Sequence, residues 1–157
     1  MAWTYRAVLR APFAVLGIRV EDDALVGVDI LDGRAVPVVP DHPIARLACE
    51  QLRAYFDDPH AVFDLPIRLC GTPHRLRVWQ ALRAISCGST LSYGELARRL
   101  DSAPRAVGGA CGANPLPIVV PCHRVVAKHG LGGFMGGAKT RPLAIKRWLL
   151  AHEGVKT

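Results

Sequence analysis

NPLPIVVPCHRVV, residues 114–126, is an apolar segment with three prolines that places Cys122 directly before His123. Each proline fixes its own φ angle and restricts the residue before it, so the cysteine lies on a rigid segment. A thiol held in this way beside an imidazole is a candidate nucleophile. The alternative is a small buried hydrophobic residue, because most free cysteines are buried. Residues 121–123 alone leave both interpretations open.

The length and composition are those of a soluble globular protein. The chain has 157 residues, enough for one ordinary domain or for two small ones that share an interface. Its longest apolar runs, such as residues 118–120, are far too short to span a bilayer. The first residues show no signal-peptide pattern. We therefore expect no membrane association and an intracellular protein, cytoplasmic or, if the source is eukaryotic, nuclear.

The five cysteines are scattered along the chain without CxxC spacing. An odd number in this arrangement favours neither a disulfide framework nor a zinc ribbon. The sequence also offers no clear set of metal ligands, so we expect no metal site. A reducing compartment fits best, because a nucleophilic thiol must be kept from pairing.

Charge is distributed unevenly between the two halves of the chain. Residues 1–71 contain 7 Arg and 10 acidic residues, whereas residues 72–157 contain 13 Lys or Arg and 3 acidic residues. The net charges are therefore −3 and +10, and the basic half carries Cys122. A basic half-chain favours a polyanionic partner such as nucleic acid, because phosphate neutralisation releases counterions. A merely soluble basic surface is the alternative.

The first part of the sequence predicts antiparallel strands over residues 3–9, 13–20 and 24–31, separated by turn residues. An amphipathic helix should follow and cover one face of this sheet. Residues 62–69 read as one more extended segment, and residues 71–73 mark a domain boundary. The apolar stripe of the predicted helix consists of Ile44, Leu47, Ala48, Leu52, Tyr55 and Phe56.

The second part of the sequence is mainly helical. Thr72 and Pro73 form a helix start, and residues 87–88 should end that helix. Ser92 and Glu95 form a capping box that opens a short helix, and a tight turn leads to a further helix over residues 104–113. Two short helices joined in this way in a basic region resemble a helix-turn-helix. The apolar stripe of the helix after Thr72 consists of Leu76, Val78, Trp79, Leu82 and Ile85.

The segment 104–113 is unusual for a helix that reads the major groove of DNA, because Arg105 is its only long polar side chain. Gly108, Gly109 and Gly112 each weaken a helix by about 1 kcal/mol relative to alanine. Small side chains allow close approach of a partner, so the segment suits a narrow groove with Arg105 as the probing side chain. A loose helix packed closely on a neighbour is the alternative.

Residues 130–137 form a glycine-rich loop that lacks the spacing of a phosphate-binding loop. The loop could wrap a planar ligand or serve as a solvated connector. Thr140 and Pro142 then begin a final helix that ends at residues 152–154. Its apolar side consists of Leu143, Trp148, Leu149 and Leu150.

Several of these strings occur together in an order typical of one family. They are SYG at 92–94, RAVG at 105–108, NP at 114–115, PCHRV at 121–125 and LLAHE at 149–153. With them the chain resembles the methylated-DNA–protein-cysteine methyltransferases, or O6-alkylguanine-DNA alkyltransferases. The resemblance is continuous over residues 71–154, and in the first 70 residues only the strand and helix pattern agrees.

The resemblance implies a ribonuclease-H-like α/β domain over residues 1–71 and a winged-helix domain over residues 72–157. It implies a monomer that binds double-stranded DNA through the minor groove. The reaction would be irreversible, single-turnover transfer of an alkyl group from O6-alkylguanine, with O4-alkylthymine as a further substrate to consider, after base flipping. No cofactor is implied.

The resemblance also implies roles for individual residues. Cys122 would accept the alkyl group, His123 would act as its base through a water, and Glu153 would orient His123. Asn114 would fix the turn before the cysteine, and Tyr93 would assist the departing guanine. The implied DNA contacts are Arg105, which would fill the vacated stack, and Ala106, Gly108, Gly109, Ser92 and Arg124. The implied pocket for the flipped base consists of Val125, Phe134, Met135 and Gly136.

The chain departs from the family pattern in three places. Phe134 and Met135 stand where a tyrosine and a small or polar residue are usual, so a hydroxyl that could bond the base oxygen is absent. The segment 100–105 is short, and His74 replaces a common aromatic. We predict an intact reaction with altered alkyl-group preference or rate. The alternatives are a non-catalytic sensor of alkylated bases and a cysteine hydrolase, which would show multiple turnover.

Overall fold

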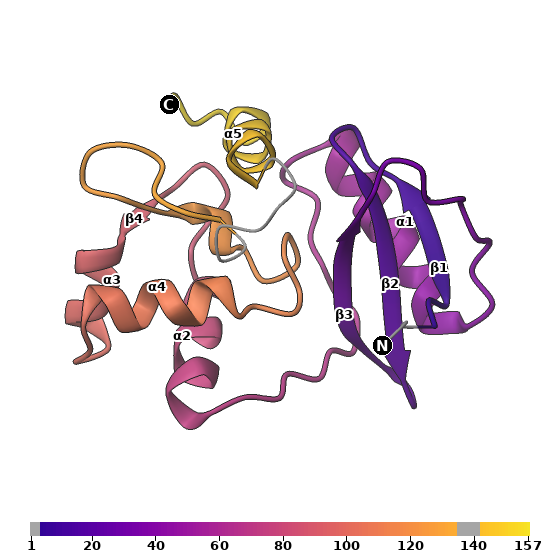
Figure 1. Cartoon of the computed structure of the whole chain (residues 1–157), viewed down its shortest axis with the longest axis horizontal. Helices are drawn as coiled ribbons and strands as arrows, with labels where there is room; N and C mark the ends of the chain where they lie inside the picture. Colours follow the sequence, from indigo (N-terminus) through magenta and orange to yellow (C-terminus); the bar gives the residue numbers. More distant parts are fainter. Residues whose placement is uncertain (1–3, 135–141) are drawn as a thin grey trace. The chain divides into compact units, whose positions relative to one another are not determined.

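The computed structural model describes residues 4–134 and 142–157. The chain divides into two compact units, Met1–Leu69 and Cys70–Thr157, which are considered separately here. The division lies two residues before the boundary expected at residues 71 and 72. The chain contains both strands and helices and has a mixed α/β fold (Figure 1).

The first unit contains a three-stranded antiparallel sheet in the order β1-β2-β3. Its strands are β1 (Ala7–Arg10), β2 (Val15–Glu21) and β3 (Ala24–Leu31). The tight turn between β2 and β3 places Asp22 at a φ of 51°, a conformation that aspartate tolerates better than most residues. The antiparallel pairing of β1 with β2 and of β2 with β3 confirms the predicted meander. Strands β1 and β2 begin later and end one residue beyond their predicted ranges, and β3 matches its predicted range.

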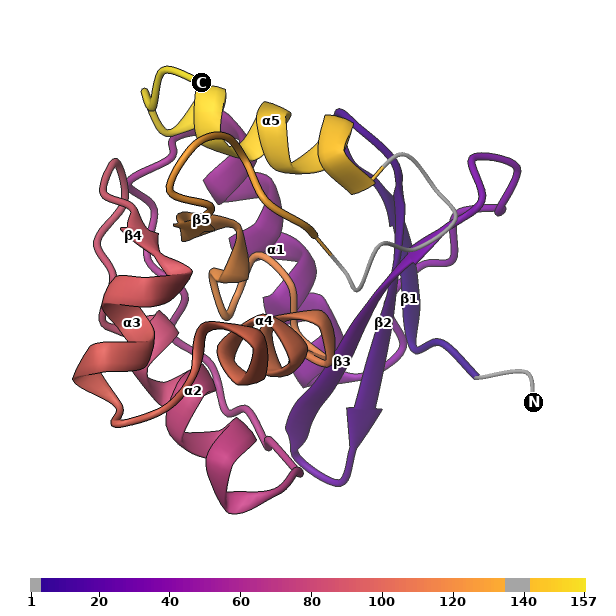
Figure 2. The ribbon, with the colours of Figure 1, turned by 60° about the vertical axis from the view of Figure 1, so that its left-hand side comes forward.

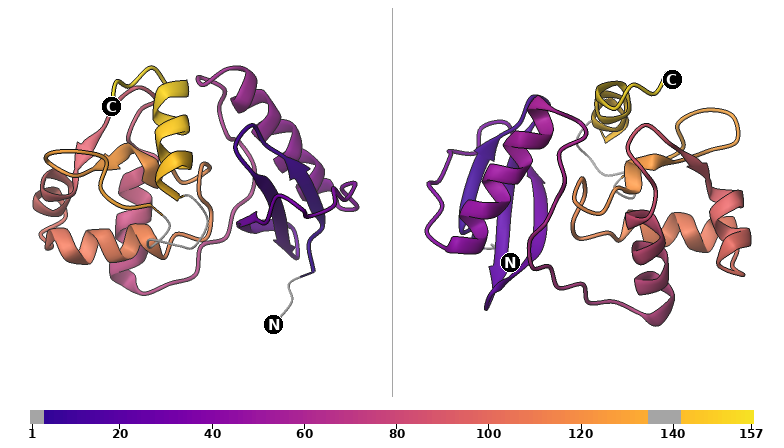
Figure 3. Two further views of the ribbon diagram at one scale, coloured as in Figure 1. Left: turned by 45° about the horizontal axis from the view of Figure 1, so that its top comes forward. Right: turned by 180° about the vertical axis from the view of Figure 1, so that it is seen from behind.

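Helix α1 (Pro43–Asp57) packs against all three strands and crosses one face of the sheet (Figure 3, right). His42 caps it, since its Nδ1 accepts from the backbone N–H of Ile44 at 3.0 Å. The extended segment predicted at 62–69 joins the sheet only by a bridge of Ile67 to Leu25. The side chains that α1 buries are Ala45, Ala48, Cys49, Leu52 and Tyr55.

The second unit begins with α2 (Pro73–Arg83), which Thr72 caps by accepting from Arg75 N at 3.2 Å. The helices α3 (Tyr93–Arg99) and α4 (Pro104–Gly112) follow and pack against each other (Figure 2). The capping box of Ser92 and Glu95 is present at the start of α3. Helix α2 contacts α4, where Trp79 Nε1 donates to the Ala110 carbonyl at 2.8 Å.

The remaining elements of this unit surround the segment that carries Cys122. The short strands β4 (Leu91–Ser92) and β5 (Val125–Val126) pair in parallel. Between α4 and β5, the residues Cys122–Arg124 form a single 3-10 turn, η1. Helix α5 (Pro142–His152) packs against this turn. The predicted cap at Thr140 lies outside the described residues.

Two details of the α2 prediction are wrong. The helix ends at Arg83, earlier than the predicted end at residues 87–88, because the N–H groups of Ala84 and Ile85 bond three residues back to Ala81 and Leu82. Such bonds tighten the last turn and end the helix. Leu76, predicted on the apolar stripe, is exposed, while Val78, Trp79 and Leu82 are buried.

Candidate functional site

The loop between α4 and η1 is held by the side chain of Asn114. Its Nδ2 donates to Val120 O at 2.8 Å, and its Oδ1 accepts from Leu116 N at 2.9 Å. Within this loop Ile118 has a φ of 76°, a conformation that costs a β-branched residue about 1–3 kcal/mol. The two hydrogen bonds hold the backbone at Leu116 and at Val120, on either side of Ile118. Asn114 therefore fixes the loop that leads to Cys122.

Cys122 lies at the start of η1 and is only 3% exposed. Burial raises the pKa of its thiol, and this dominates over a hydrogen bond from Asn114 and the positive charge of Lys146, which both lower it. The thiol is therefore the resting form at neutral pH. A base must remove its proton before the sulfur can act as a nucleophile.

His123, the residue after Cys122, is completely buried, and its Nε2 lies 2.7 Å from Glu153 Oε2. Burial lowers the pKa of the imidazole, although the Glu153 carboxylate opposes this effect. The other ring nitrogen, Nδ1, is buried without a hydrogen-bond partner among the described residues. A neutral imidazole with one nitrogen bound to a carboxylate and the other free has the form of a general base.

Arg124, the third residue of η1, binds the same carboxylate. Its Nε donates to Glu153 Oε1 at 2.9 Å and its Nη2 donates to Glu153 Oε2 at 3.1 Å. Its Nη1 donates to the Ile85 carbonyl. The sequence predicted a DNA contact for Arg124, but the structure directs the guanidinium into the protein, where a buried carboxylate needs a positive partner.

Lys146 on α5 is a member of the site that the sequence analysis missed. It is fully buried, and its Nζ donates to Val125 O at 2.7 Å and to Gly133 O at 2.8 Å. Burial lowers the pKa of Lys146 to about 8, while the neighbouring Cys122 and Cys111 thiols raise it. The ammonium therefore joins β5 to the glycine loop and lies within electrostatic reach of the nucleophile.

Tyr93 lies on the same side of the unit as Lys146, whose Nζ is 5.7 Å from the centre of its ring. The phenol donates to Gly133 O at 3.3 Å, and burial raises its pKa to about 12. Gly132 has a φ of 73°, and a Cβ there would come within 2.7 Å of the Tyr93 ring. Only glycine permits this close approach of the loop to the tyrosine.

The predicted DNA-contacting residues lie mainly on the exposed face of α4. Arg105, Ala106 and Gly109 are exposed there, and Gly108 is half-buried. The opposite face, with Val107, Ala110 and Cys111, is buried. Ser92 lies at the start of α3, where its hydroxyl oxygen accepts from Glu95 N at 3.0 Å.

The predicted base pocket is described only in part. Val125 is buried in β5, and its carbonyl oxygen accepts a hydrogen bond from Lys146 Nζ. Phe134 is buried at the end of the described part of the loop. The other two predicted pocket residues, Met135 and Gly136, lie outside the described residues.

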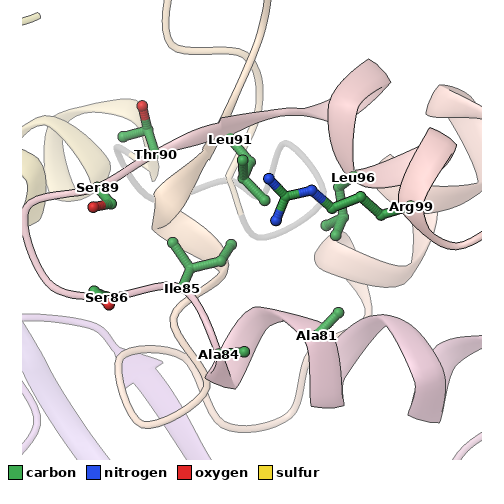
Figure 4. A pocket seen from close by; sticks show the side chains of 9 residues that line it. All are labelled: Ala81, Ala84, Ile85, Ser86, Ser89, Thr90, Leu91, Leu96 and Arg99. Atoms are coloured by element: carbon green, nitrogen blue, oxygen red, sulfur yellow. The ribbon is translucent and has the colours of Figure 1, made fainter.

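A separate pocket of about 360 Å³ opens beside the end of α2 (Figure 4). None of the residues that line it is a predicted site residue, so it adds nothing to the Cys122 site. Within residues 4–134 and 142–157, no three His, Cys, Asp or Glu side chains group as metal ligands. Nor is any helix in these ranges long and apolar enough to cross a membrane. The pocket is lined by Ala81, Ala84, Ile85, Ser86, Ser89, Thr90, Leu91, Leu96 and Arg99.

Known proteins are similar to this chain in sequence and in structure. Residues 73–155 match the family described as "6-O-methylguanine DNA methyltransferase, DNA binding domain". A Salmonella typhimurium protein named methylated-DNA–protein-cysteine methyltransferase is 50% identical over 109 residues, 67% of this chain and 61% of that protein. A Methanosarcina acetivorans protein of the same name is 36% identical over 158 residues, 96% of this chain and 98% of that protein.

Among solved structures, Mycobacterium tuberculosis OGT in complex with DNA matches with a TM-score of 0.80 at 36% identity. The match covers 94% of this chain and 91% of that one. The chain thus resembles a solved structure over nearly its whole length, although it spans only 61% of the length of the Salmonella relative.

Proposed function

Because the chain belongs to the methylated-DNA–protein-cysteine methyltransferase family, we propose that it repairs alkylated DNA by moving an alkyl group onto Cys122. The observation that carries this proposal is the buried pair of His123 and Glu153, in which His123 directly follows the buried Cys122 in the chain. The substrate would be O6-alkylguanine in double-stranded DNA, with O4-alkylthymine as a second substrate to test.

The proposed reaction begins when a water passes the Cys122 proton to His123 Nδ1, the ring nitrogen that has no partner among the described residues. Glu153, bonded to Nε2, stabilises the imidazolium that forms. The thiolate attacks the alkyl carbon, a carbon–sulfur bond forms, and the carbon–oxygen bond breaks with its electron pair going to the guanine oxygen. Tyr93 then assists the departing base by supplying a proton to it, and the proton held by the His123 imidazolium returns through solvent to the Tyr93 phenolate.

The product would be a thioether on Cys122, which has no good leaving group. One molecule would therefore repair one lesion, and the protein would act as a stoichiometric reagent. No cofactor is needed at any step of this scheme.

DNA would bind to the second unit, whose residues 72–157 carry a net charge of +10. We propose that this unit is a winged-helix domain and that the first is ribonuclease-H-like, as the family resemblance implies. The small residues Ala106, Gly108 and Gly109 on α4 favour a close approach to the minor groove. Arg105, exposed at the start of α4, would fill the space left by the flipped base and offset part of the few kcal/mol that flipping costs.

The test is intact-mass analysis after the protein is mixed with a duplex that contains O6-methylguanine. We expect a mass gain of one CH₂ per protein molecule, located on Cys122 by peptide mapping, and no further conversion when the duplex is in excess. An unmodified duplex serves as the control. Either no gain in mass or turnover beyond one lesion per chain would contradict the proposal.

Phe134→Tyr tests the effect of the departure at that position. The added hydroxyl can bond the base oxygen, and a neutral hydrogen bond of this kind contributes about 0.5–1.5 kcal/mol. We therefore expect the single-turnover rate on O6-methylguanine to rise by about threefold to tenfold, with a different ratio between methyl and benzyl substrates. Rapid-quench kinetics on both substrates would measure this change. Unchanged rates on both would show that Phe134 does not line the pocket.

A further inference from the structure

Arg124 donates its hydrogen bonds to groups within the protein, and these bonds indicate its role. Its side chain is 13% exposed, whereas the side chain of Glu153 is completely buried. Two of its nitrogens donate to the two oxygens of Glu153, at 2.9 and 3.1 Å. A third nitrogen donates to the Ile85 carbonyl and holds the guanidinium in place. The carboxylate is thus shared between Arg124 and His123.

This sharing decides where the protons of the His123–Glu153 pair reside. A carboxylate buried without a positive partner is costly and takes up a proton instead. If Glu153 were protonated, it could donate to Nε2, and the neutral imidazole would then carry its proton on Nδ1. If the proton moved to the ring, both ring nitrogens would carry one. In either case Nδ1 could not accept a proton from Cys122.

The charged groups that act on His123 come from two elements. Glu153, just after α5, favours the imidazolium, while Arg124 on η1 and Lys146 on α5 oppose it. Arg124 has the larger opposing effect of the two cations. Lys146 donates its hydrogen bonds to Val125 O and Gly133 O. Arg124 donates hydrogen bonds to the Glu153 carboxylate and is the cation paired with it among the residues that the structure describes.

We infer that Arg124 is a positioning residue that keeps Glu153 ionised and thereby holds His123 in the tautomer with Nε2 protonated and Nδ1 free. This inference rests on the proposed function, in which Nδ1 receives the Cys122 proton. It replaces the DNA contact expected for Arg124 with a role that acts through Glu153 and His123.

The test uses the full chain without DNA, labelled with ¹⁵N in its histidine rings. In the unsubstituted protein at neutral pH, we expect the His123 spectrum of a neutral ring with unprotonated Nδ1. In Arg124→Gln we expect Nδ1 to be protonated at the same pH. Arg124→Lys keeps the charge and should restore the original spectrum. Arg147→Gln removes an exposed positive charge from α5 and should change nothing.

Single-turnover kinetics provide the second readout. The positive charge of Arg124 lowers the pKa of His123, so removing that charge raises it. Removing a nearby charge shifts a pKa by about one unit or more. The acid limb of the rate profile of Arg124→Gln should therefore move up by about one pH unit, while those of Arg124→Lys and Arg147→Gln stay in place. A lower rate with an unmoved profile would indicate a merely structural role and overturn the inference.

Should Arg124→Gln not fold, ¹³C spectra of Glu153 in the unsubstituted protein decide the question. We expect an ionised carboxylate over the whole pH range in which the protein is folded. A protonated Glu153 near neutral pH, or a His123 ring with its proton on Nδ1, would overturn the inference. These spectra need no DNA and no alkyl transfer. A protein with the expected spectra that gains no mass from O6-methylguanine would contradict the proposed function alone.

Discussion

Cys122→Ala is expected to abolish alkyl transfer completely and to leave binding to alkylated DNA intact. The side chain is small and buried, so its loss removes the nucleophile without touching the exposed face of α4. The loss should be complete because the sulfur is the atom that receives the alkyl group in the proposed reaction. Intact-mass analysis measures the transfer, and a fluorescence anisotropy titration with a labelled duplex measures the binding.

The matched control is Cys111→Ala, which removes a second buried thiol of the same unit. This variant should still gain one CH₂ per molecule. Transfer that persists in Cys122→Ala would show that another residue is the acceptor. Equal binding with no transfer in the unsubstituted protein would instead favour a sensor of alkylated bases, and catalytic turnover would favour a hydrolase.

Lys146→Met is expected to slow alkyl transfer by at least about tenfold at neutral pH. The ammonium lowers the pKa of Cys122, and removing a nearby opposite charge typically shifts a pKa by about one unit or more. The substitution also leaves the carbonyls of Val125 and Gly133 without their donor. Single-turnover rates across a pH series would show the alkaline shift. An unchanged profile would exclude an electrostatic role for Lys146.

Lys146→Met should also change how the free energy of unfolding depends on pH. In the folded chain the pKa of Lys146 is about 8, against an ordinary value of 10.5, so between these values the unfolded chain binds more protons. This residue alone therefore raises the free energy of unfolding as the pH increases from about 8 to 10.5. Below that range its charge destabilises the fold by a constant amount.

Urea unfolding at a series of pH values measures this contribution as the difference between the unsubstituted protein and Lys146→Met. The buried cysteines have raised pKa values, which destabilise the fold at alkaline pH. Comparing the two proteins removes the part of this opposite trend that does not depend on Lys146. The free energy of unfolding of the unsubstituted protein minus that of Lys146→Met should increase between about pH 8 and pH 10.5. Parallel curves would mean that Lys146 has the same pKa in the folded and the unfolded chain, and would contradict the lowered pKa.

Local signals in the sequence predicted much of the fold. The turns that separate the first three strands fixed their order, and Thr72 and the Ser92–Glu95 box marked two helix starts where the structure has them. These features depend on contacts within a few residues. The end of α2 was predicted too late, because the helix ends through a tightening of its last turn. The residue types of Ala84 and Ile85 do not indicate this tightening.

The candidate site was predictable where it depends on adjacent residues and missed where it depends on distant ones. Residues 122–123 stand together in the sequence, but nothing local shows which neighbour Arg124 will bind 29 residues later. For Lys146 a signal did exist, since it precedes the buried Leu149 and Leu150 by three and four positions on one helix face. A lysine at such a position is seldom buried without a partner.

The burial of Cys122 also governs how the protein waits for its substrate. Under the proposed single-turnover reaction, a chain would be lost if its sulfur reacted first with a dissolved electrophile or a peroxide. At 3% exposure the Cys122 sulfur is shielded from solvent. Its raised pKa keeps it protonated until a general base removes the proton. In the proposed function, the packing around the thiol would therefore protect the sulfur of a chain that has not yet met alkylated DNA.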